Sequence, residues 1–382
     1  MRILLAEGSG RGFLNQYSHA LALGLHEAGE RVRLVTGRRD ELADWVVPFE
    51  KDACLADGLA GWLCLCGQVK RFNPDLVHLQ WIDHPLAALV FLRWAHYRGV
   101  RVIYTPHNIL PHERRWLSLP FFREIYRSLD RVVVRDLHLG WALEELLDTP
   151  QERLAYLPGS PNPLALPDFP SSFPPELAGC QPGELRILFF GHGSGRKGLG
   201  EFLEVMAGCE WPEQLHLVVA GEGVLAGVNG DLLGRARARV RISVLDRYLR
   251  PSEVSALFSQ GELLVMPYRK QCKSPLTDLA AAFGVPVLRS DRVQGVGFQD
   301  GEHGLTYPHD QQGQLTKILQ DLVMYPGVLE ILHRGLAGKT AVSDAICKLA
   351  DGHRVMYREL QASFNPLPLE SGMVGNTVGG GL

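Results

Sequence analysis

Short apolar runs alternate with segments of helical spacing along most of this 382-residue chain. In its first half the apolar runs occupy residues 3–6, 31–36, 76–79, 101–105 and 131–134. A second series occupies residues 185–190, 215–220, 241–245, 262–266 and 286–288. Uninterrupted apolar runs are typical of parallel strands that helices cover on both faces. We therefore predict an α/β fold in which two doubly wound units face each other across a cleft.

A proline-rich stretch separates the two series. Residues 158–183 contain eight prolines, too many for a helix or a strand, so we expect a linker there. The predicted organisation is an N-terminal domain at 1–160, a linker at 161–184, a C-terminal domain at 185–340, a helix at 341–364 that packs back on the N-terminal domain, and a disordered tail at 365–382.

The composition excludes several classes of protein. Hydrophobic residues make up 46% and charged residues 21%, and the formal net charge is −3, so no overall positive field favours nucleic acid. No run reaches the roughly 18 to 20 apolar residues of a membrane-spanning helix, and the N-terminus lacks the apolar region of about 7 to 15 residues of a signal peptide. The seven cysteines, without C-x-x-C spacing, indicate reduced thiols. We expect a cytoplasmic protein.

Two glycine-rich loops, Gly8–Gly12 and Gly191–Gly198, each lie between a predicted strand and a helix. Such loops let backbone N–H groups approach phosphate, although a plain strand-to-helix turn explains either loop about as well. Arg196 and Lys197 strengthen the second loop, because cations at its mouth can neutralise a diphosphate. The sequence contains no D-x-D motif, in which two aspartates flank a single residue. We therefore predict diphosphate binding without a D-x-D metal site and without a cofactor.

The segment at 104–113, Tyr-Thr-Pro-His-Asn-Ile-Leu-Pro-His-Glu, gathers polar groups at the end of a predicted strand. His107 and Asn108 follow the strand, and Glu113 follows within the same turn. Polar side chains in such a place need partners, so packing explains them poorly. We interpret His107, Asn108 and Glu113 as candidate catalytic residues.

Four segments occur in an informative order over residues 1–360. They are H-N-x-x-P-H-E at 107–113, the glycine loop with K-G at 190–198, the segment at 267–287 that begins P-Y-R and ends F-G-x-P-V, and D-G-E-x-G-L at 300–305. In these segments the chain resembles the family 4 (group 1) glycosyltransferases of the GT-B fold, of the bacterial exopolysaccharide type. The resemblance implies two Rossmann-like domains, an N-terminal acceptor domain and a C-terminal domain for the nucleotide-sugar donor.

The resemblance also implies roles for single residues. Gly10 and Gly12 would form the turn that admits the acceptor and the donor's diphosphate, and His107 would lie against the transferred sugar. Lys197, helped by Arg196, would bind the leaving diphosphate. The other candidate donor-binding residues are Glu222 at the base pocket, Tyr268 and Arg269 beside the nucleotide, and Ser274, Leu276 and Asp278 at a helix whose first residue we expect to be Pro275.

The chain departs from the family pattern in two places. The family's E-x7-E pair falls on Gln271 and Leu279, so the glutamate that holds the ribose is replaced, and Asp278 is the candidate substitute. The family's arginine between Gly191 and Lys197 is also missing, because the run His-Gly-Ser-Gly at 192–195 stands in its place. The alternative function is therefore a catalytically inactive GT-B scaffold, or a nucleotide-sugar-binding protein of a polysaccharide complex.

Residues 93–135 are basic and aromatic, with nine arginines against three acidic residues. Arginine beside Trp and Phe on one amphipathic face favours anionic lipid headgroups. A buried helix with a solvated basic side explains the pattern equally well. The first interpretation predicts a peripheral protein on the inner face of the plasma membrane.

Together these observations predict a metal-independent glycosyltransferase that moves a sugar from a nucleotide diphosphate to a lipid-linked oligosaccharide acceptor in surface polysaccharide synthesis. The resemblance implies retention at the anomeric carbon. The enzyme would contribute orientation and charge stabilisation of the departing diphosphate. A nicotinamide-dependent oxidoreductase is disfavoured, because no ribose-binding carboxylate closes the second strand.

Overall fold

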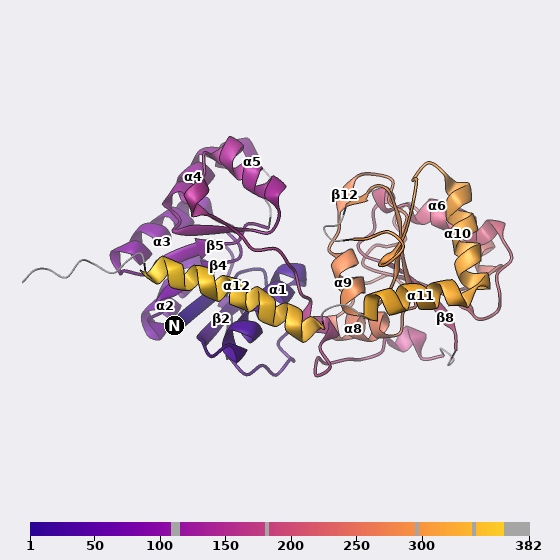
Figure 1. Ribbon diagram of the computed structural model, residues 1–382, viewed down its shortest axis with the longest axis horizontal. Coiled ribbons are helices and arrows are strands. Elements are labelled where there is room, and N and C mark those ends of the chain that lie inside the picture. The colour runs from indigo at the N-terminus through magenta and orange to yellow at the C-terminus, as the bar shows by residue number, and fades with distance from the viewer. Residues whose placement is uncertain (108–114, 180–182, 295–297, 338–340, 363–382) are drawn as a thin grey trace, which may run out of the picture.

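The computed structural model describes residues 1–107, 115–179, 183–294, 298–337 and 341–362. It contains two large parallel sheets, each with helices on both faces, in two halves that lie side by side (Figure 1). The prediction of two doubly wound α/β units is therefore confirmed. None of the described helices is both long enough and apolar enough to cross a bilayer.

The N-terminal sheet has the strand order β3-β2-β1-β4-β5-β6-β7. Its strands are β1 (Arg2–Glu7), β2 (Arg31–Gly37), β3 (Glu50–Leu55), β4 (Leu76–Leu79), β5 (Arg101–Tyr104), β6 (Arg131–Val134) and β7 (Leu154–Tyr156). The helices of this half are α1 (Gly12–Glu27), α2 (Leu59–Phe72), α3 (Pro85–Tyr97), α4 (Arg115–Ser128) and α5 (Leu137–Leu147). Successive residues of β1 face opposite sides, so Ile3 and Leu5 belong to the core that includes α1, whereas Leu4 and Ala6 belong to the core that includes α2 and α3.

The C-terminal sheet has the strand order β10-β9-β8-β11-β13-β15. Its strands are β8 (Leu185–Phe190), β9 (Leu215–Ala220), β10 (Arg241–Leu245), β11 (Leu263–Met266), β13 (Val287–Ser290) and β15 (Gly304–Tyr307), and β12 (Cys272–Lys273) pairs with β14 (Val293–Gln294) beside it. The helices are α6 (Leu199–Gly208), α7 (Gly230–Arg237), α8 (Pro251–Ser259), α9 (Leu276–Ala282), α10 (Gln312–Met324) and α11 (Pro326–Ala337).

Some elements differ from the sequence-based expectation. The apolar runs did not predict β3, β7 and β15, because β3 has the mixed sequence EKDACL and all three lie at sheet edges, where burial is incomplete. Helix α1 begins at Gly12, so the last residue of the first glycine loop is already helical. Helix α9 begins at Leu276, so Pro275 is its N-cap and not its first residue.

Between the two sheets, the proline-rich stretch contains only short 3₁₀ turns among its described residues, at Pro163–Ala165 and Pro175–Leu177. We keep the predicted domain boundaries as a working description of the two halves. The expected disordered tail at 365–382 lies outside the described residues.

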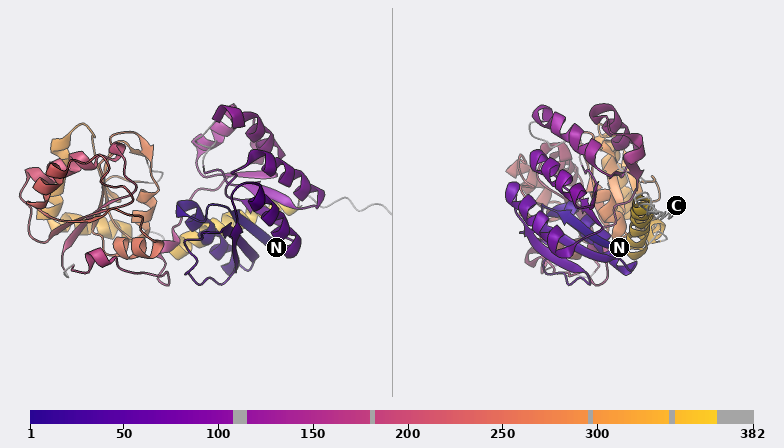
Figure 2. Two further views of the ribbon diagram at one scale, coloured as in Figure 1. Left: turned by 180° about the vertical axis from the view of Figure 1, so that it is seen from behind. Right: turned by 90° about the vertical axis from the view of Figure 1, so that its left-hand side faces the viewer.

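The last helix, α12 (Val342–Ala362), returns from the C-terminal half and packs against α1 of the N-terminal half (Figures 1 and 2). Its Tyr357 hydroxyl forms a hydrogen bond of 2.6 Å with His78 Nδ1 on β4. His78 Nε2 in turn lies 2.7 Å from the Thr105 hydroxyl, just after β5. The helix is thereby tied to the strand that leads to His107.

Candidate active site

Each sheet reverses its strand order beside its first strand, and ligands of doubly wound sheets bind at the carboxyl ends of the strands there. In the C-terminal half the reversal lies between β8 and β11, and the loop 191–198 leaves β8. Gly198 has a φ of +73° and faces the carbonyl oxygen of Pro267, so any side chain at this position would collide with that backbone. The glycine loop is therefore held against the end of β11.

Lys197 ends the 3₁₀ turn of this loop, and its side chain lies over Gly191, where a Cβ would collide with the Lys197 Nζ. Burial lowers the pKa of Lys197 to about 8, and the neighbouring charge of Arg196 acts in the same direction. Leu276, at the start of α9, lies against the same glycine. A partly desolvated cation in a strand-to-helix turn is suited to an anionic ligand such as a diphosphate.

Two more predicted donor residues lie beside the start of α9. Tyr268 is buried, and its hydroxyl lies 3.4 Å from the Ser274 hydroxyl. The Ser274 hydroxyl also accepts the Leu276 N–H at 3.4 Å, a long contact that leaves it able to bond a ligand. The structure thus brings Tyr268, Ser274 and Leu276 together near Lys197.

Arg196, Arg269 and Glu222 are exposed at the rim of the same loop. The Arg269 N–H donates to the Arg196 carbonyl at 2.8 Å, but the Arg269 guanidinium pairs with Glu201 at 3.0 Å. Glu222 contacts the loop through its backbone, since its carbonyl accepts the Gly193 N–H at 2.9 Å. Arg269 must therefore leave its present partner before its charge can serve a nucleotide.

Asp278 and Arg135 influence each other electrostatically from the two halves. The Asp278 residue is exposed, yet desolvation by the protein around its carboxyl raises the pKa of that group to about 6, and the charge of Arg135 only partly offsets this. Beside them, Asp136 at the start of α5 pairs with Lys273 of β12 at 3.2 Å. Charged groups of both halves therefore meet in front of the two binding edges.

His107 follows β5 and is enclosed by aromatic rings. Its imidazole packs edge-on against Tyr17 and Phe13, with centroid distances of 5.4 and 6.2 Å, and its Nε2 lies 3.2 Å from Gln80 Oε1. Burial, with the charge of Arg135, lowers the pKa of His107 to about 3, so the ring is neutral near pH 7. Asn108 and Glu113, the other predicted catalytic residues, lie outside the described residues.

Three buried polar atoms around His107 have no hydrogen-bond partner within the described part of the chain. They are His107 Nδ1, Gln80 Nε2 and the Tyr17 hydroxyl. Buried polar groups are nearly always paired, so these unpaired ones mark the surroundings of His107 as unusual.

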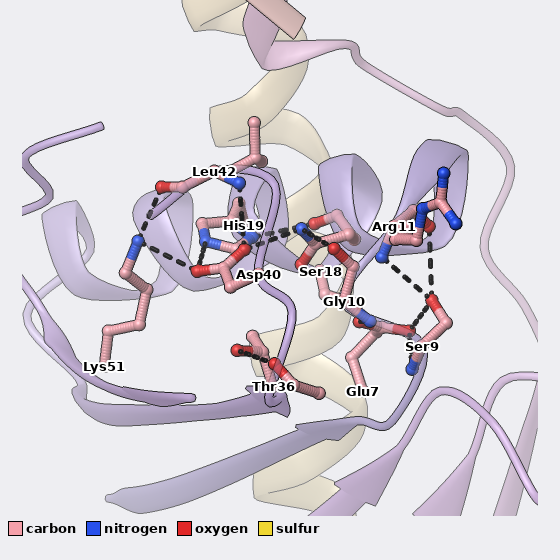
Figure 3. Close-up of polar contacts among 12 residues, drawn as sticks. Glu7, Ser9, Gly10, Arg11, Ser18, His19, Thr36, Asp40, Leu42 and Lys51 are labelled. Atoms are coloured by element: carbon pink, nitrogen blue, oxygen red, sulfur yellow. Dashed lines mark hydrogen bonds and ion pairs between the residues drawn. The ribbon is translucent and has the colours of Figure 1, made fainter. Parts of the chain in front are cut away.

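The first glycine loop, between β1 and α1, is closed by the chain's own carboxylates. Glu7 accepts hydrogen bonds of 2.8 Å from the N–H groups of Ser9 and Gly10, and a further one from the Ser9 hydroxyl (Figure 3). Glu41 accepts the Gly12 N–H at 2.5 Å. The N–H groups of Gly10 and Gly12 are therefore already paired. Their predicted role toward a diphosphate stays a prediction, and a ligand would have to displace these carboxylates to use them.

A buried polar network behind this loop fixes the start of α1 (Figure 3). Asp40 Oδ1 accepts from Asn15 Nδ2 at 2.8 Å and from the Leu42 N–H at 3.0 Å. Asp40 Oδ2 lies 3.1 Å from Lys51 Nζ and 3.8 Å from His19 Nε2. Burial lowers the pKa of His19 to about 4, although Asp40 acts in the opposite direction. The loop is thus held rigidly by neighbours on β3 and α1.

A pocket of about 660 Å³ lies at the opposite edge of the N-terminal half and contains none of the predicted site residues. Two of its arginines are engaged within the protein, since Arg101 pairs with Asp130 at 2.6 Å and Arg153 donates to the Leu129 carbonyl at 2.6 Å. We assign this pocket no part in the candidate site.

The sequence analysis missed Arg135, Glu7 and Glu41. Arg135 directly follows β6, and Glu7 ends β1. Their position at the carboxyl ends of parallel strands was the available signal, because those ends form the binding edge. Glu41 lies in a loop, and nothing in its sequence surroundings distinguishes it.

Two family models match the sequence. The one described as Glycosyltransferase Family 4 matches residues 14–159, and the one described as Glycosyl transferases group 1 matches residues 184–324. Together they cover more than half of the chain. A comparison with curated proteins finds no match.

Several solved structures share the fold. Sucrose-phosphate synthase from Thermosynechococcus elongatus is 19% identical, with a TM-score of 0.64 over 95% of this chain and 100% of that chain. HepE from Anabaena, in complex with UDP, is 14% identical, with a TM-score of 0.64 over 95% of this chain and 100% of that chain. At these identities the likeness establishes the arrangement of the two halves, while the family models identify the chain. The chain therefore belongs to the family 4 (group 1) glycosyltransferases and has their GT-B fold.

Proposed function

We propose that this glycosyltransferase takes its sugar from a nucleoside diphosphate and transfers it, with retention at the anomeric carbon, to a lipid-linked acceptor in surface polysaccharide synthesis. The observation that carries the proposal is the position of Lys197, a half-buried cation in a glycine loop at the switch point of the C-terminal sheet. An anion is the natural partner of such a group. A nucleoside diphosphate supplies that anion and also the leaving group.

In this proposal Lys197 stabilises the diphosphate as the glycosidic bond breaks. Negative charge grows on the leaving oxygen at that moment, so a preorganised cation lowers the barrier more than it strengthens ground-state binding. Arg196 adds positive charge at the rim, and the Ser274 hydroxyl adds a donor. These groups would act without a divalent ion.

The transferred sugar would lie at the end of β5. His107, Gln80 and Tyr17 offer three unpaired polar atoms there, and sugar hydroxyls both donate and accept hydrogen bonds. The neutral state of His107 suits this role, because one ring nitrogen then accepts while the other donates. Asp278 is our candidate for the ribose, in place of the family's glutamate.

The lipid-linked acceptor implies contact with a membrane, and α3 offers a surface for it. Leu86, Val90, Arg93 and Tyr97 recur on one side of this helix, and all four are exposed. Farther along the basic stretch Phe121 is exposed, whereas Phe122 is buried in the core of this half. We therefore centre the proposed membrane contact on α3.

The donor site is tested with UDP first, because the Anabaena relative was solved with UDP and with UDP-glucose. A thermal-shift panel of nucleoside diphosphates and nucleotide sugars then identifies the base and the sugar. A ligand at 100 times its dissociation constant adds about 2.7 kcal/mol to stability. An inactive scaffold, the alternative function, would bind the donor but neither hydrolyse nor transfer it.

Two variants separate diphosphate binding from sugar transfer. Lys197→Ala should weaken nucleoside diphosphate binding and lower kcat by about a hundredfold or more, whereas Lys270→Ala, an exposed lysine nearby, should change neither. His107→Ala should lower kcat yet leave diphosphate affinity nearly intact, because that ligand carries no sugar. Calorimetry with the diphosphate and turnover of the donor provide the two readouts. Our assignment of the two loops would be wrong if His107→Ala lost diphosphate binding, or if Lys197→Ala bound the diphosphate as tightly as the unaltered protein.

A further inference from the structure

A small pocket lies at the carboxyl ends of β1, β3 and β4 in the N-terminal half. Its volume is about 160 Å³. A cavity of about 150 Å³ accommodates a benzene ring, so this pocket has room for one six-membered ring. It lies where the strand order reverses between β1 and β4, the position at which doubly wound sheets bind ligands.

The pocket combines aromatic and acidic side chains. Trp62 and Trp81 line it, together with Asp57, Asp83 and the backbone of the first glycine loop. Few polar groups among apolar and aromatic ones are typical of a small-molecule site. No basic side chain is among the described residues that line the pocket.

Asp83 holds the pocket in shape. One of its oxygens accepts the Gly58 N–H at 2.6 Å, and the other accepts the Trp62 indole N–H at 3.0 Å. An ionised carboxylate has about four acceptor positions, so each oxygen of Asp83 can accept one more donor. The Asp57 carboxylate makes no hydrogen bond within the described residues and offers all its acceptor positions.

The pocket shares its edge with the candidate catalytic group. Trp81 follows Gln80, whose side chain contacts His107 at 3.2 Å. On the other side Ser9 lines the pocket and also bonds Glu7. A ligand bound here therefore lies on the N-terminal face that the donor sugar would approach from the C-terminal half.

We propose that this pocket binds a neutral sugar ring of the acceptor. The indole faces of Trp62 and Trp81 would pack against the apolar C–H surface of the ring, and Asp57 and Asp83 would accept hydrogen bonds from its hydroxyls. A uronic acid or a phosphorylated sugar would place a negative charge beside two carboxylates without a cation to neutralise it, so the pocket selects against both. The acceptor role rests on the proposed function, whereas binding of the ring does not.

The full-length protein labelled with 5-fluorotryptophan tests the binding. Its seven tryptophans give separate ¹⁹F resonances, which Trp→Phe variants assign. Methyl glucoside, galactoside and mannoside are titrated, and methyl glucuronide is the matched anionic probe. We expect the Trp62 and Trp81 resonances to shift with at least one neutral glycoside, and the glucuronide to bind at least tenfold more weakly. The exposed Trp141 of α5 should not respond.

Variants of the pocket supply the second test. Followed at Trp62, Trp81→Ala should weaken the neutral glycoside at least tenfold, while Trp81→Phe, which keeps an aromatic face, should retain most of the affinity. Asp57→Asn should reduce the discrimination against the glucuronide. Unchanged Trp62 and Trp81 resonances with every neutral glycoside would overturn the proposal, as would glucuronide binding as tight as glucoside binding.

The same samples distinguish this proposal from the proposed function. UDP is added to each variant, and its affinity should be the same in Trp81→Ala as in the unaltered protein. Glycoside binding without binding of any nucleoside diphosphate would leave the ring pocket standing and remove the glycosyl-transfer role. Diphosphate binding without glycoside binding would remove the ring pocket and leave the proposed glycosyl-transfer role standing.

Discussion

At the scale of single residues, burial sets the charge state of the groups at the candidate site. Burial lowers the pKa of His107 to about 3 and that of Lys197 to about 8. The consequence differs for the two, since a neutral imidazole is ready to bond sugar hydroxyls, whereas a neutral lysine is a poor partner for a diphosphate. Lys197 should therefore make donor binding sensitive to pH.

The affinity for UDP should fall as the pH rises through 8. The pKa of Lys197 is about 8 in the free protein, so above that pH the lysine must take up a proton before it can pair with the diphosphate. That requirement costs up to about 1.4 kcal/mol per pH unit, or tenfold in affinity. Lys197→Arg stays charged throughout and should bind UDP with little change from pH 7 to pH 9. Calorimetry at three pH values checks this, and parallel curves for the two proteins would assign the dependence to another group.

At the scale of elements, the central strands were predictable because apolar residues dominate each of them, as in Ile187 to Phe190. The edge strand β3 was not, since its incomplete burial admits charged residues that hide the pattern. The second glycine loop could be located in the same way, by its place after a strand. What the sequence could not reveal was pairing over distance, such as Gly12 with Glu41 or Lys273 with Asp136.

Helix α12 makes a buried contact of this long-range kind, and its contribution can be measured. Tyr357→Phe removes the hydroxyl that bonds His78 Nδ1 and leaves that nitrogen buried without a partner. An unsatisfied buried group costs about 1 to 3 kcal/mol, so the free energy of unfolding in urea should fall by that amount. Tyr97→Phe, at an exposed tyrosine of α3, is the matched control and should be neutral. Equal stability of the two variants would show that the Tyr357–His78 hydrogen bond adds nothing measurable, and would leave apolar packing and the pairing of Arg354 with Glu30 to hold α12.

At the scale of the whole molecule, few described polar contacts join the two halves. The Tyr248 hydroxyl donates to Glu41, the Arg11 guanidinium lies 4.7 Å from the centre of the Tyr248 ring, and Lys273 pairs with Asp136. Interfaces of this kind permit relative motion, and the donor and acceptor would approach from opposite halves. A membrane that carries the lipid-linked acceptor would then contact the outer face of the N-terminal half.

If α3 is that face, the protein should bind vesicles that contain anionic phospholipid, and salt should weaken the binding. Each basic residue near such a surface contributes about 1 kcal/mol, so Arg93→Glu with Arg98→Glu should lower binding at least about tenfold without loss of fold. Co-sedimentation with phosphatidylglycerol and phosphatidylcholine vesicles measures this. Val90→Asp should weaken binding by removing apolar contact, whereas Tyr325→Asp, at an exposed tyrosine of the other half, should not. Equal binding to neutral and anionic vesicles, or equal loss in the Tyr325 control, would place the acceptor's membrane contact elsewhere.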